Sequence, residues 1–198
     1  MDGNAGLWLN LHIAIMFKGK SLMKSTIDTV NSTSRSNALL IMYPLVECAD
    51  WVSEATVDKR PFENHLKLAK ALIETIMKAD NNQQLELFKG HPELAGVKAI
   101  EGEMTIASQG EQGRLGLLNL NPENMTQLHS LNAKYRAHFG YPFIIALHRI
   151  PDLKTLFSIF NSRIKNTLEE EHTTTLKEIA SVIESRTARL FSTVNYKK

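Results

Sequence analysis

Apolar residues recur every three or four positions along most of the chain from Asn37 onward, which is the spacing of one face of an α-helix. The clearest stripe consists of Phe62, Leu66, Ala69, Leu72, Ile73, Ile76 and Met77. Pro61 stands ahead of it, in a position that favours a helix start. No segment convincingly alternates apolar and polar residues as a half-buried strand does. The pattern therefore predicts an all-α protein with about seven or eight helices.

Proline, glycine and capping residues predict where these helices begin and end. A first helix carries Leu39, Leu40, Tyr43 and Val46 and is interrupted at Pro44, because proline removes an amide donor and clashes with the preceding turn. Asn121-Pro122 begins a helix that Gly140 ends, with a buried stripe of Met125, Leu128, Leu131, Tyr135 and Phe139. Another helix opens at Pro151 or Asp152, and a long last helix runs from about Thr173 to Phe191.

The first 36 residues depart from this pattern. The apolar stretch from Leu7 to Phe17 is too short to span a bilayer and lacks the flanks of a signal peptide. Ser25 to Asn37 is rich in Ser, Thr and Asn, which is typical of a linker. We therefore expect residues 1–36 to be an N-terminal extension and residues 37–195 to form a single compact domain.

The segment from Phe143 to Leu147 is a second exception, an apolar run between Pro142 and the His148-Arg149 pair. Periodicity does not distinguish a short buried strand from a buried extended connection here. In either conformation its buried amides need hydrogen-bond partners, and a polar ligand can supply them.

Charge and cysteine content narrow the classes of function. The chain has 23 basic and 21 acidic residues, a net charge of +2 and no basic run, so neither nucleic acid nor a membrane is an expected partner. Cys48 is the single cysteine and has no partner for an internal disulfide, which fits a reducing, intracellular compartment. The ending Tyr196-Lys197-Lys198 is not a Ser-Lys-Leu address, so we expect the cytosol rather than the peroxisome.

His91 is the first candidate for chemistry. It precedes Pro92, which disfavours a helical conformation for His91, so the helix carrying Leu85, Leu87 and Phe88 must end by Gly90 or His91. The imidazole is then held at a helix break, where it can exchange a proton near neutral pH, or it simply caps the following turn. The seven histidines show no metal-ligand spacing such as two on one helix face four apart, which disfavours a metal hydrolase.

Ser108-Gln109-Gly110-Glu111 is the second candidate. The spacing matches a capping box, in which serine and glutamate satisfy each other's backbone amides at a helix start. Yet Gly110, Gly113 and Gly116 follow at every third position, each costing ~1 kcal/mol in a helix. They leave a bare face for a backbone or a flat ligand, and a helix N-terminus attracts a carboxylate. Both interpretations, a cap and an active-site carboxylate, remain open at this point.

Three blocks in order carry a family resemblance. They are His91-Pro92-Glu93-Leu94-Ala95-Gly96, then Ser108-Gln109-Gly110-Glu111-Gln112 with Gly116-Leu117, then Leu131-Asn132, Tyr135 and Phe139-Gly140-Tyr141-Pro142-Phe143-Ile144-Ile145-Ala146. Together they resemble the family of 2-oxo-4-hydroxy-4-carboxy-5-ureidoimidazoline decarboxylases. The similarity extends more weakly upstream through Trp51-Val52 and Arg60-Pro61-Phe62, and so covers about Leu39 to Phe191.

The resemblance implies an all-helical, homodimeric enzyme of urate degradation that uses no cofactor and no metal. Such an enzyme removes CO2 from the ureidoimidazoline and protonates it stereospecifically to (S)-allantoin. By motif, His91 is the catalytic acid, Glu111 its carboxylate partner and Arg189 the arginine that binds substrate. The implied substrate-binding residues are Pro92, Ser108, Gln109, Gly110 and Gln112, with the backbone amides of Phe143, Ile144, Ile145, Ala146 and Leu147.

The choice of arginine rests on the resemblance alone. On a helical wheel Leu176, Ile179, Ile183, Thr187 and Leu190 share one face, and Arg189 falls away from it, as a solvated residue does. Arg186 lies nearer the edge of that face and is the competing choice.

Two other classes of function stay open at the sequence level. One is a helical ligand-binding protein of the same fold that lacks activity, which would bind without turnover. The other is a metal-dependent enzyme of the amidohydrolase type that uses some of the seven histidines, which chelation would inactivate.

Overall fold

The computed structural model describes residues 26–96 and 106–191. These residues form nine α-helices and three short 3-10 helices and contain no strand, which confirms the all-α prediction. In chain order the elements are α2 (Ile27–Ser32), α3 (Arg35–Met42), η1 (Tyr43–Leu45), α4 (Asp50–Val57), α5 (His65–Lys78), α6 (Asn81–Gly90), α8 (Ile106–Arg114), η2 (Leu117–Asn119), α9 (Pro122–Phe139), η3 (Leu147–Arg149), α10 (Leu153–Arg163) and α11 (Leu168–Phe191). None of these helices combines the length and hydrophobicity needed to cross a bilayer.

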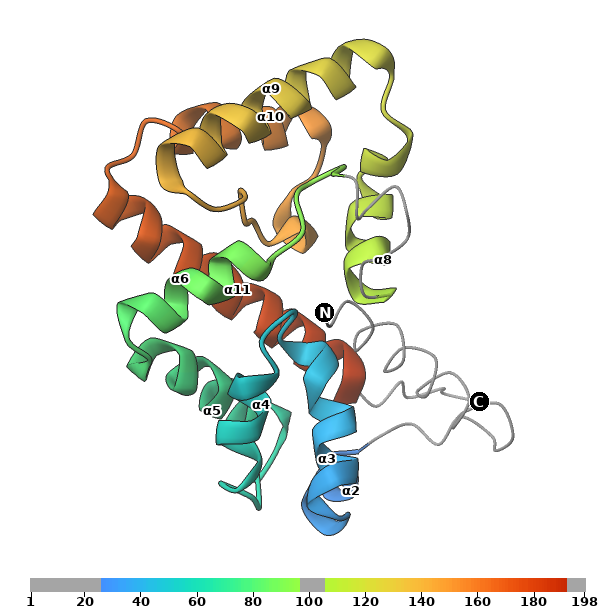
Figure 1. Cartoon of the computed structure of the whole chain (residues 1–198). Coiled ribbons are helices and arrows are strands. Elements are labelled where there is room, and N and C mark those ends of the chain that lie inside the picture. The colour runs from blue at the N-terminus through green and yellow to red at the C-terminus, as the bar shows by residue number, and fades with distance from the viewer. Residues whose placement is uncertain (1–25, 97–105, 192–198) are drawn as a thin grey trace, which may run out of the picture.

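Helix α11 passes through the middle of the molecule (Figure 1). Helices α2 to α5 lie on one side of it and α9 with α10 on the other, while α8 stands near the end of α6. Helix α11 packs most extensively against α5. It buries Ile179, Ile183 and Phe191, and its C-terminal half faces α8. This arrangement lets one helix contribute side chains to both halves of the core.

The linker predicted for Ser25 to Asn37 is wrong from Thr26 onward. Thr26 caps α2 and Ser34 caps α3, because Ser and Thr accept hydrogen bonds from helix amides as well as occurring in loops. Val30 is fully buried, and Arg60 donates to its carbonyl at 3.0 Å. These residues therefore belong to the packed structure, and α2 and α4 are two helices that the periodicity did not predict.

The start of α5 is also displaced from its predicted position. Asn64 is the N-cap and accepts from the Lys67 amide at 3.0 Å, so the helix begins at His65 rather than at Pro61. The capping side chain of Asn64, rather than the proline three residues earlier, thus sets where the helix begins. Of the predicted stripe, Phe62, Ala69, Leu72 and Ile76 are buried, as expected. Leu66 and Met77 are exposed, and Leu68, which the stripe did not include, is buried instead.

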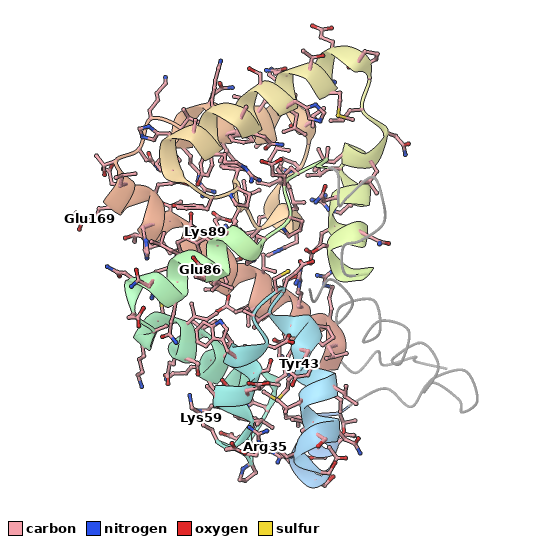
Figure 2. The ribbon with its side chains drawn as sticks, viewed as in Figure 1. Arg35, Tyr43, Lys59, Glu86, Lys89 and Glu169 are labelled. Atoms are coloured by element: carbon pink, nitrogen blue, oxygen red, sulfur yellow. The ribbon has the colours of Figure 1, made fainter. Side chains whose placement is uncertain are left out.

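Salt bridges at the surface of the α2–α5 half connect neighbouring helices. Arg35 at the start of α3 pairs with Asp58 at the end of α4, with 3.0 Å between Nε and Oδ1. Figure 2 shows Arg35 and Lys59 at the outer end of this half and Tyr43 nearer the centre of the molecule. Such exposed pairs fix orientation more than they stabilise the fold.

Four predicted helix boundaries in the second half can be compared directly. Helix α9 has its N-cap at Asn121 and its left-handed C-cap at Gly140, as predicted. Asp152, not Pro151, caps α10. Helix α11 begins at Leu168, five residues before the prediction. There Thr167 and Glu170 satisfy each other's amides in a capping arrangement, which the apolar stripe does not reveal.

A cluster of aromatic rings fills the space between α9, α10 and α11. Tyr135, Phe143 and Phe160 are fully buried, and the rings of Phe143 and Phe160 stack with centroids 3.8 Å apart. Arg163 lies over the Phe143 ring and pairs with Glu171, which is completely buried, at 2.9 Å. This cluster supports the apolar run from Phe143 to Leu147, which is an irregular connection leading into η3 and not a strand.

Candidate active site

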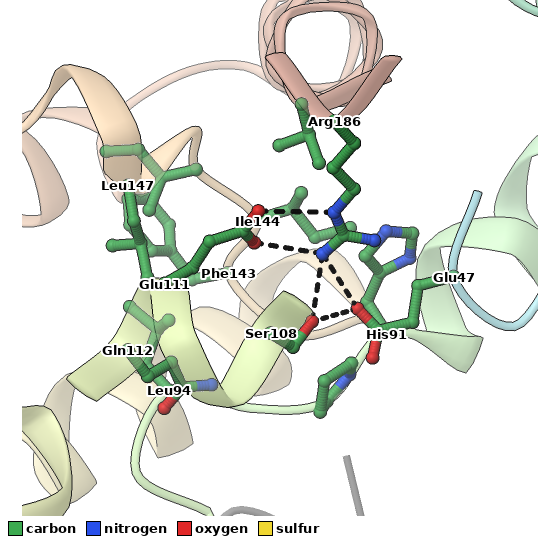
Figure 3. A pocket seen from close by; sticks show the side chains of 13 residues that line it. Glu47, His91, Leu94, Ser108, Glu111, Gln112, Phe143, Ile144, Leu147 and Arg186 are labelled. Atoms are coloured by element: carbon green, nitrogen blue, oxygen red, sulfur yellow. Dashed lines mark hydrogen bonds and ion pairs between the residues drawn. The ribbon is translucent and has the colours of Figure 1, made fainter. Parts of the chain in front are cut away.

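A small cavity of about 50 Å³ lies between α8, the loop that begins at His91 and the C-terminal half of α11 (Figure 3). Its lining consists of Glu47, His91, Pro92, Leu94, Ser108, Glu111, Gln112, Phe143, Ile144, Ile145, Leu147, Val182 and Arg186. The residues come from five regions that are far apart in the sequence. The site is therefore a product of tertiary packing.

His91 is placed at the helix break that the sequence predicted. It is the C-cap of α6, with extended backbone angles forced by Pro92. Its Nδ1 lies 2.8 Å from the carbonyl oxygen of Leu87. Because a carbonyl only accepts, Nδ1 carries a proton, and Nε2 is the nitrogen left to exchange one. The ring thus caps the preceding helix and not the following turn.

Burial lowers the pKa of His91 below its usual range. The hydrogen bond to Leu87 and the negative charge of Glu47 oppose this shift, and the positive charge of Arg186 adds to it. The resting imidazole is therefore neutral near pH 7.

Arg186 projects from α11 into the middle of the cavity, between Glu111 on one side and Glu47 on the other (Figure 3). It donates to Glu111 Oε2 at 2.9 Å, to Glu47 Oε2 at 3.1 Å and to Ser108 Oγ at 2.9 Å. Its side chain is 6% exposed, so this charge depends on its two carboxylates for compensation. Glu111 and Glu47 accordingly raise the pKa of Arg186 against the effect of burial.

Both carboxylates stay ionised in the cavity. Burial acts to raise the pKa of Glu111, but Arg186 and Arg189 outweigh it and hold that pKa low. For Glu47, burial is likewise outweighed by Arg186 and by a hydrogen bond from Ser108. Each carboxylate is therefore an acceptor of hydrogen bonds rather than a reservoir of protons.

Arg189 reaches Glu111 from outside the cavity. Its guanidinium pairs with Glu111 Oε1, but its side chain is 53% exposed and it is not part of the lining. Arg186 lies one turn earlier on α11 and occupies the lining instead. The structure thus places Arg186, the competing choice, in the cavity. Arg189, the arginine that the resemblance implies, lies at its rim.

The connection that follows Pro142 is held in place by side chains that donate hydrogen bonds to its carbonyl groups. Arg163 donates to the Ile144 oxygen at 2.8 Å, and Arg114 donates to the oxygens of Leu147 and, at 2.7 Å, of Ile150. The amide of Ala146 donates to Glu178 at 2.7 Å. Within the described residues the buried amides of Phe143, Ile144 and Ile145 have no hydrogen-bond acceptor. Buried amides of this kind call for a partner.

Helix α8 presents one face to the cavity. Ser108, Glu111 and Gln112 lie three and four residues apart and line it, whereas Gln109 and Gly110 project elsewhere and do not. Gln112 also accepts from the Ala95 amide at 2.9 Å, which fixes the loop after His91. Because α8 already begins at Ile106, Ser108 is not an N-cap, and the capping-box interpretation of the motif is wrong.

The glycines of α8 do not serve a close approach. A Cβ built at Gly110 or Gly113 would meet nothing within 4 Å among the described residues, so the bare face predicted for them is not occupied by another backbone. Gly116 has a positive φ of 68° just beyond the helix and is needed there for the chain to turn.

Most of the predicted site residues meet at the cavity. His91, Pro92, Ser108, Glu111, Gln112, Phe143, Ile144, Ile145 and Leu147 line it, while Gln109, Gly110, Ala146 and Arg189 do not. Glu47, Leu94 and Val182 were missed. For Glu47 the available signal was an acidic residue between apolar neighbours just after Pro44, which by itself indicates no function. Across residues 26–96 and 106–191, no three His, Cys, Asp or Glu side chains gather as metal ligands do.

The fold and this cavity define a small helical protein with a buried, charge-paired site and with backbone donors that no described residue accepts from. The model of the OHCU decarboxylase family, named for its ureidoimidazoline substrate, matches residues 31–188. The chain belongs to the OHCU decarboxylase family, as the sequence motifs predicted.

Individual relatives agree with this membership. A 2-oxo-4-hydroxy-4-carboxy-5-ureidoimidazoline decarboxylase from Halalkalicoccus jeotgali is 30% identical over 158 residues, which are 80% of this chain and 87% of that protein. A solved (S)-allantoin synthase has a TM-score of 0.68 at 23% identity, and the match covers 85% of this chain and 55% of that one. A solved OHCU decarboxylase in the presence of (S)-allantoin has a TM-score of 0.62 at 18% identity, covering 77% and 99%. These two structures confirm the fold.

Proposed function

We propose that the protein decarboxylates 2-oxo-4-hydroxy-4-carboxy-5-ureidoimidazoline to (S)-allantoin in urate degradation, and that it does so without a cofactor. The observation that carries this proposal is the arrangement inside the cavity. A buried arginine is shared by two carboxylates, beside a neutral histidine and a row of amides that have no acceptor among the described residues. Family membership supplies the substrate class, and these groups match what that substrate needs.

The reaction requires two protons at defined atoms. The bond to the carboxylate breaks, its electron pair passes into the neighbouring C=N group, and the ring nitrogen takes one proton. The hydroxyl on the reacting carbon then loses its proton as the carbonyl of allantoin forms, and the adjacent carbon takes a proton on one face. The net uptake is one proton per CO2 released. Stereospecificity lies in the last transfer.

His91 is the group suited to carry the proton from the hydroxyl to the adjacent carbon, and the proton on the ring nitrogen, which is the net proton taken up, comes from solvent. Its Nε2 is unprotonated in the resting enzyme, so it can accept the hydroxyl proton and then return one as an acid. Leu87 fixes the ring so that Nε2 stays in one place, which limits delivery to one face of the substrate.

Glu111 and Arg186 are suited to binding and orientation. The low pKa of Glu111 makes it a poor base, but as a carboxylate it accepts a hydrogen bond from the substrate hydroxyl. Arg186 presents the planar, bidentate donor group that suits the substrate carboxylate, and we assign substrate binding to Arg186 rather than to Arg189. Arg189 then acts through Glu111, as its partner at the rim.

The amides of Phe143, Ile144, Ile145 and Leu147 are the donors suited to the carbonyl oxygens of the substrate. Ala146 is excluded from this group, because its amide already donates to Glu178. Arg186 occupies the centre of the cavity between the two carboxylates, so we expect its side chain to shift when the substrate binds.

The experiment is circular dichroism of urate undergoing enzymatic oxidation and hydrolysis, with and without this protein. Spontaneous decay of the substrate gives racemic allantoin, which has no signal. We expect the (S) signal to grow in proportion to added protein. Decay at the uncatalysed rate to optically inactive product would reject the proposal, and it would favour a ligand-binding role for the fold.

Two further properties are proposed on the family resemblance and composition alone. We expect a homodimer in solution, which sedimentation velocity measures directly. We expect the protein in the cytosol, which cell fractionation measures. A monomer at micromolar concentration or a particulate fraction would contradict them.

A further inference from the structure

We propose that Glu47 is a positioning residue that anchors Arg186 in the cavity while Arg186 exchanges Glu111 for the carboxylate of the substrate. The inference rests on the proposed function. It concerns a residue that the sequence motifs do not contain and that stands more than forty positions before His91.

Glu47 is built rigidly into the site. Its side chain is 4% exposed, accepts from Arg186 at 3.1 Å and accepts from Ser108 through the same oxygen, Oε2. The next residue, Cys48, has a positive φ of 56° and packs against Gly90, where an added Cβ would lie 3.1 Å from the Cys48 Cβ. This tight contact holds the segment of Glu47 against the end of the helix that carries His91.

The two carboxylates around Arg186 are not equivalent. Glu111 has a second cation, Arg189, whose half-exposed side chain reaches it from the rim. Glu111 can therefore release Arg186 and remain paired with Arg189. Glu47 is also the more buried of the two, at 4% against 12% side-chain exposure. The carboxylate that stays with Arg186 is accordingly Glu47, and the one that turns to the substrate is Glu111.

The charge balance of the site also supports the assignment of Glu47 to Arg186 and of Glu111 to the substrate. Among the described residues, the charges of Arg186 and Arg189 balance those of Glu47 and Glu111, and the substrate adds one negative charge. The charged groups acting on His91 are Glu47 and Arg186, and of these Glu47 favours the imidazolium. Glu47 thus keeps the cation in place and also supports the protonated state that His91 must pass through.

The test compares Glu47→Gln and Glu47→Asp with the control Glu63→Gln, which alters an exposed acid outside the cavity. Replacing a charged partner of Arg186 by a neutral one is expected to lower kcat/KM by about tenfold or more, mainly through KM. Glu47→Asp is expected to recover part of this loss, and Glu63→Gln to match the wild type. The rising limb of the pH–rate profile, along which His91 loses its proton to reach the neutral resting form, is expected to move to lower pH in Glu47→Gln, which a merely structural defect would not cause.

An independent readout separates this proposal from the proposed function. The pKa of His91, followed by NMR of its ring signals, is expected to fall in Glu47→Gln whether or not the wild type turns over the ureidoimidazoline. Wild-type kinetics in Glu47→Gln, or no change in the His91 pKa, would overturn the assignment. Absence of turnover in the wild type would reject the proposed function, while the NMR comparison would still decide the role of Glu47.

Discussion

The buried pair of Arg163 and Glu171 gives the most demanding prediction about stability. Arg163 is 7% exposed and Glu171 is completely buried, and the same carboxylate also accepts from Tyr135 and Asn166. Replacing Arg163 by leucine leaves that carboxylate without its cation. Removing one partner of a buried ion pair costs about 3–5 kcal/mol, which is a large part of the roughly 5–15 kcal/mol that stabilises a typical domain.

The assay is urea unfolding followed by circular dichroism at 222 nm. The double variant Arg163→Leu with Glu171→Gln is expected to lose less stability than the sum of the two single variants, because neither partner is then left charged and alone. Arg35→Leu, which breaks the half-exposed pair with Asp58, is the control and should change stability far less. A loss below about 1 kcal/mol in Arg163→Leu, or strict additivity in the double variant, would refute the reasoning.

Three further predictions follow from the same geometry. Burial lowers the pKa values of His91, His148 and His172 from 6.5, so the unfolded chain binds more protons below that pH and the free energy of unfolding should rise between pH 5.5 and 7.5. His91→Asn should reduce that rise in urea titrations, and a rise of unchanged size would contradict the buried state of His91. Arg186→Lys should lower kcat/KM by about tenfold or more, since lysine lacks the bidentate fork, whereas Arg189→Lys should have the smaller effect; the reverse order in steady-state kinetics would return the substrate-binding role to Arg189. Gly140→Ala places a side chain at a φ of 80° and should cost about 1–2 kcal/mol, while Gly113→Ala, in open space on α8, should stabilise by up to ~1 kcal/mol; thermal unfolding of both variants checks the contrast.

The sequence predicted the helices whose ends carry their own signals. Asn121-Pro122 and Gly140 bounded α9 correctly, and the proline after His91 correctly ended α6. The errors occurred where a cap lay among residues that are also common in loops. Thr26 and Ser34 were taken for linker, and Asn64 was overlooked beside Pro61.

The site residues likewise divide into those that local sequence signals predicted and those that they did not. Short motifs located His91 and Glu111, because each lies in a local block with unusual composition. Motifs on a helix do not say which of their residues face inward, and so Gln109 and Gly110 were predicted together with Ser108 and Gln112. Glu47 and Arg186 reach the cavity through the packing of η1 and α11, and only tertiary structure brings those segments together.

The central claim is that the cavity around His91, Glu111 and Arg186 makes one enantiomer of allantoin. The most direct measurement is the rate at which the circular dichroism signal of (S)-allantoin appears with wild-type protein, His91→Asn and His129→Asn, the last altering an exposed histidine on α9. We expect rapid formation of the (S) product by the wild type and His129→Asn, and only slow, racemic decay with His91→Asn. Equal rates of (S)-allantoin formation by all three proteins would contradict this claim.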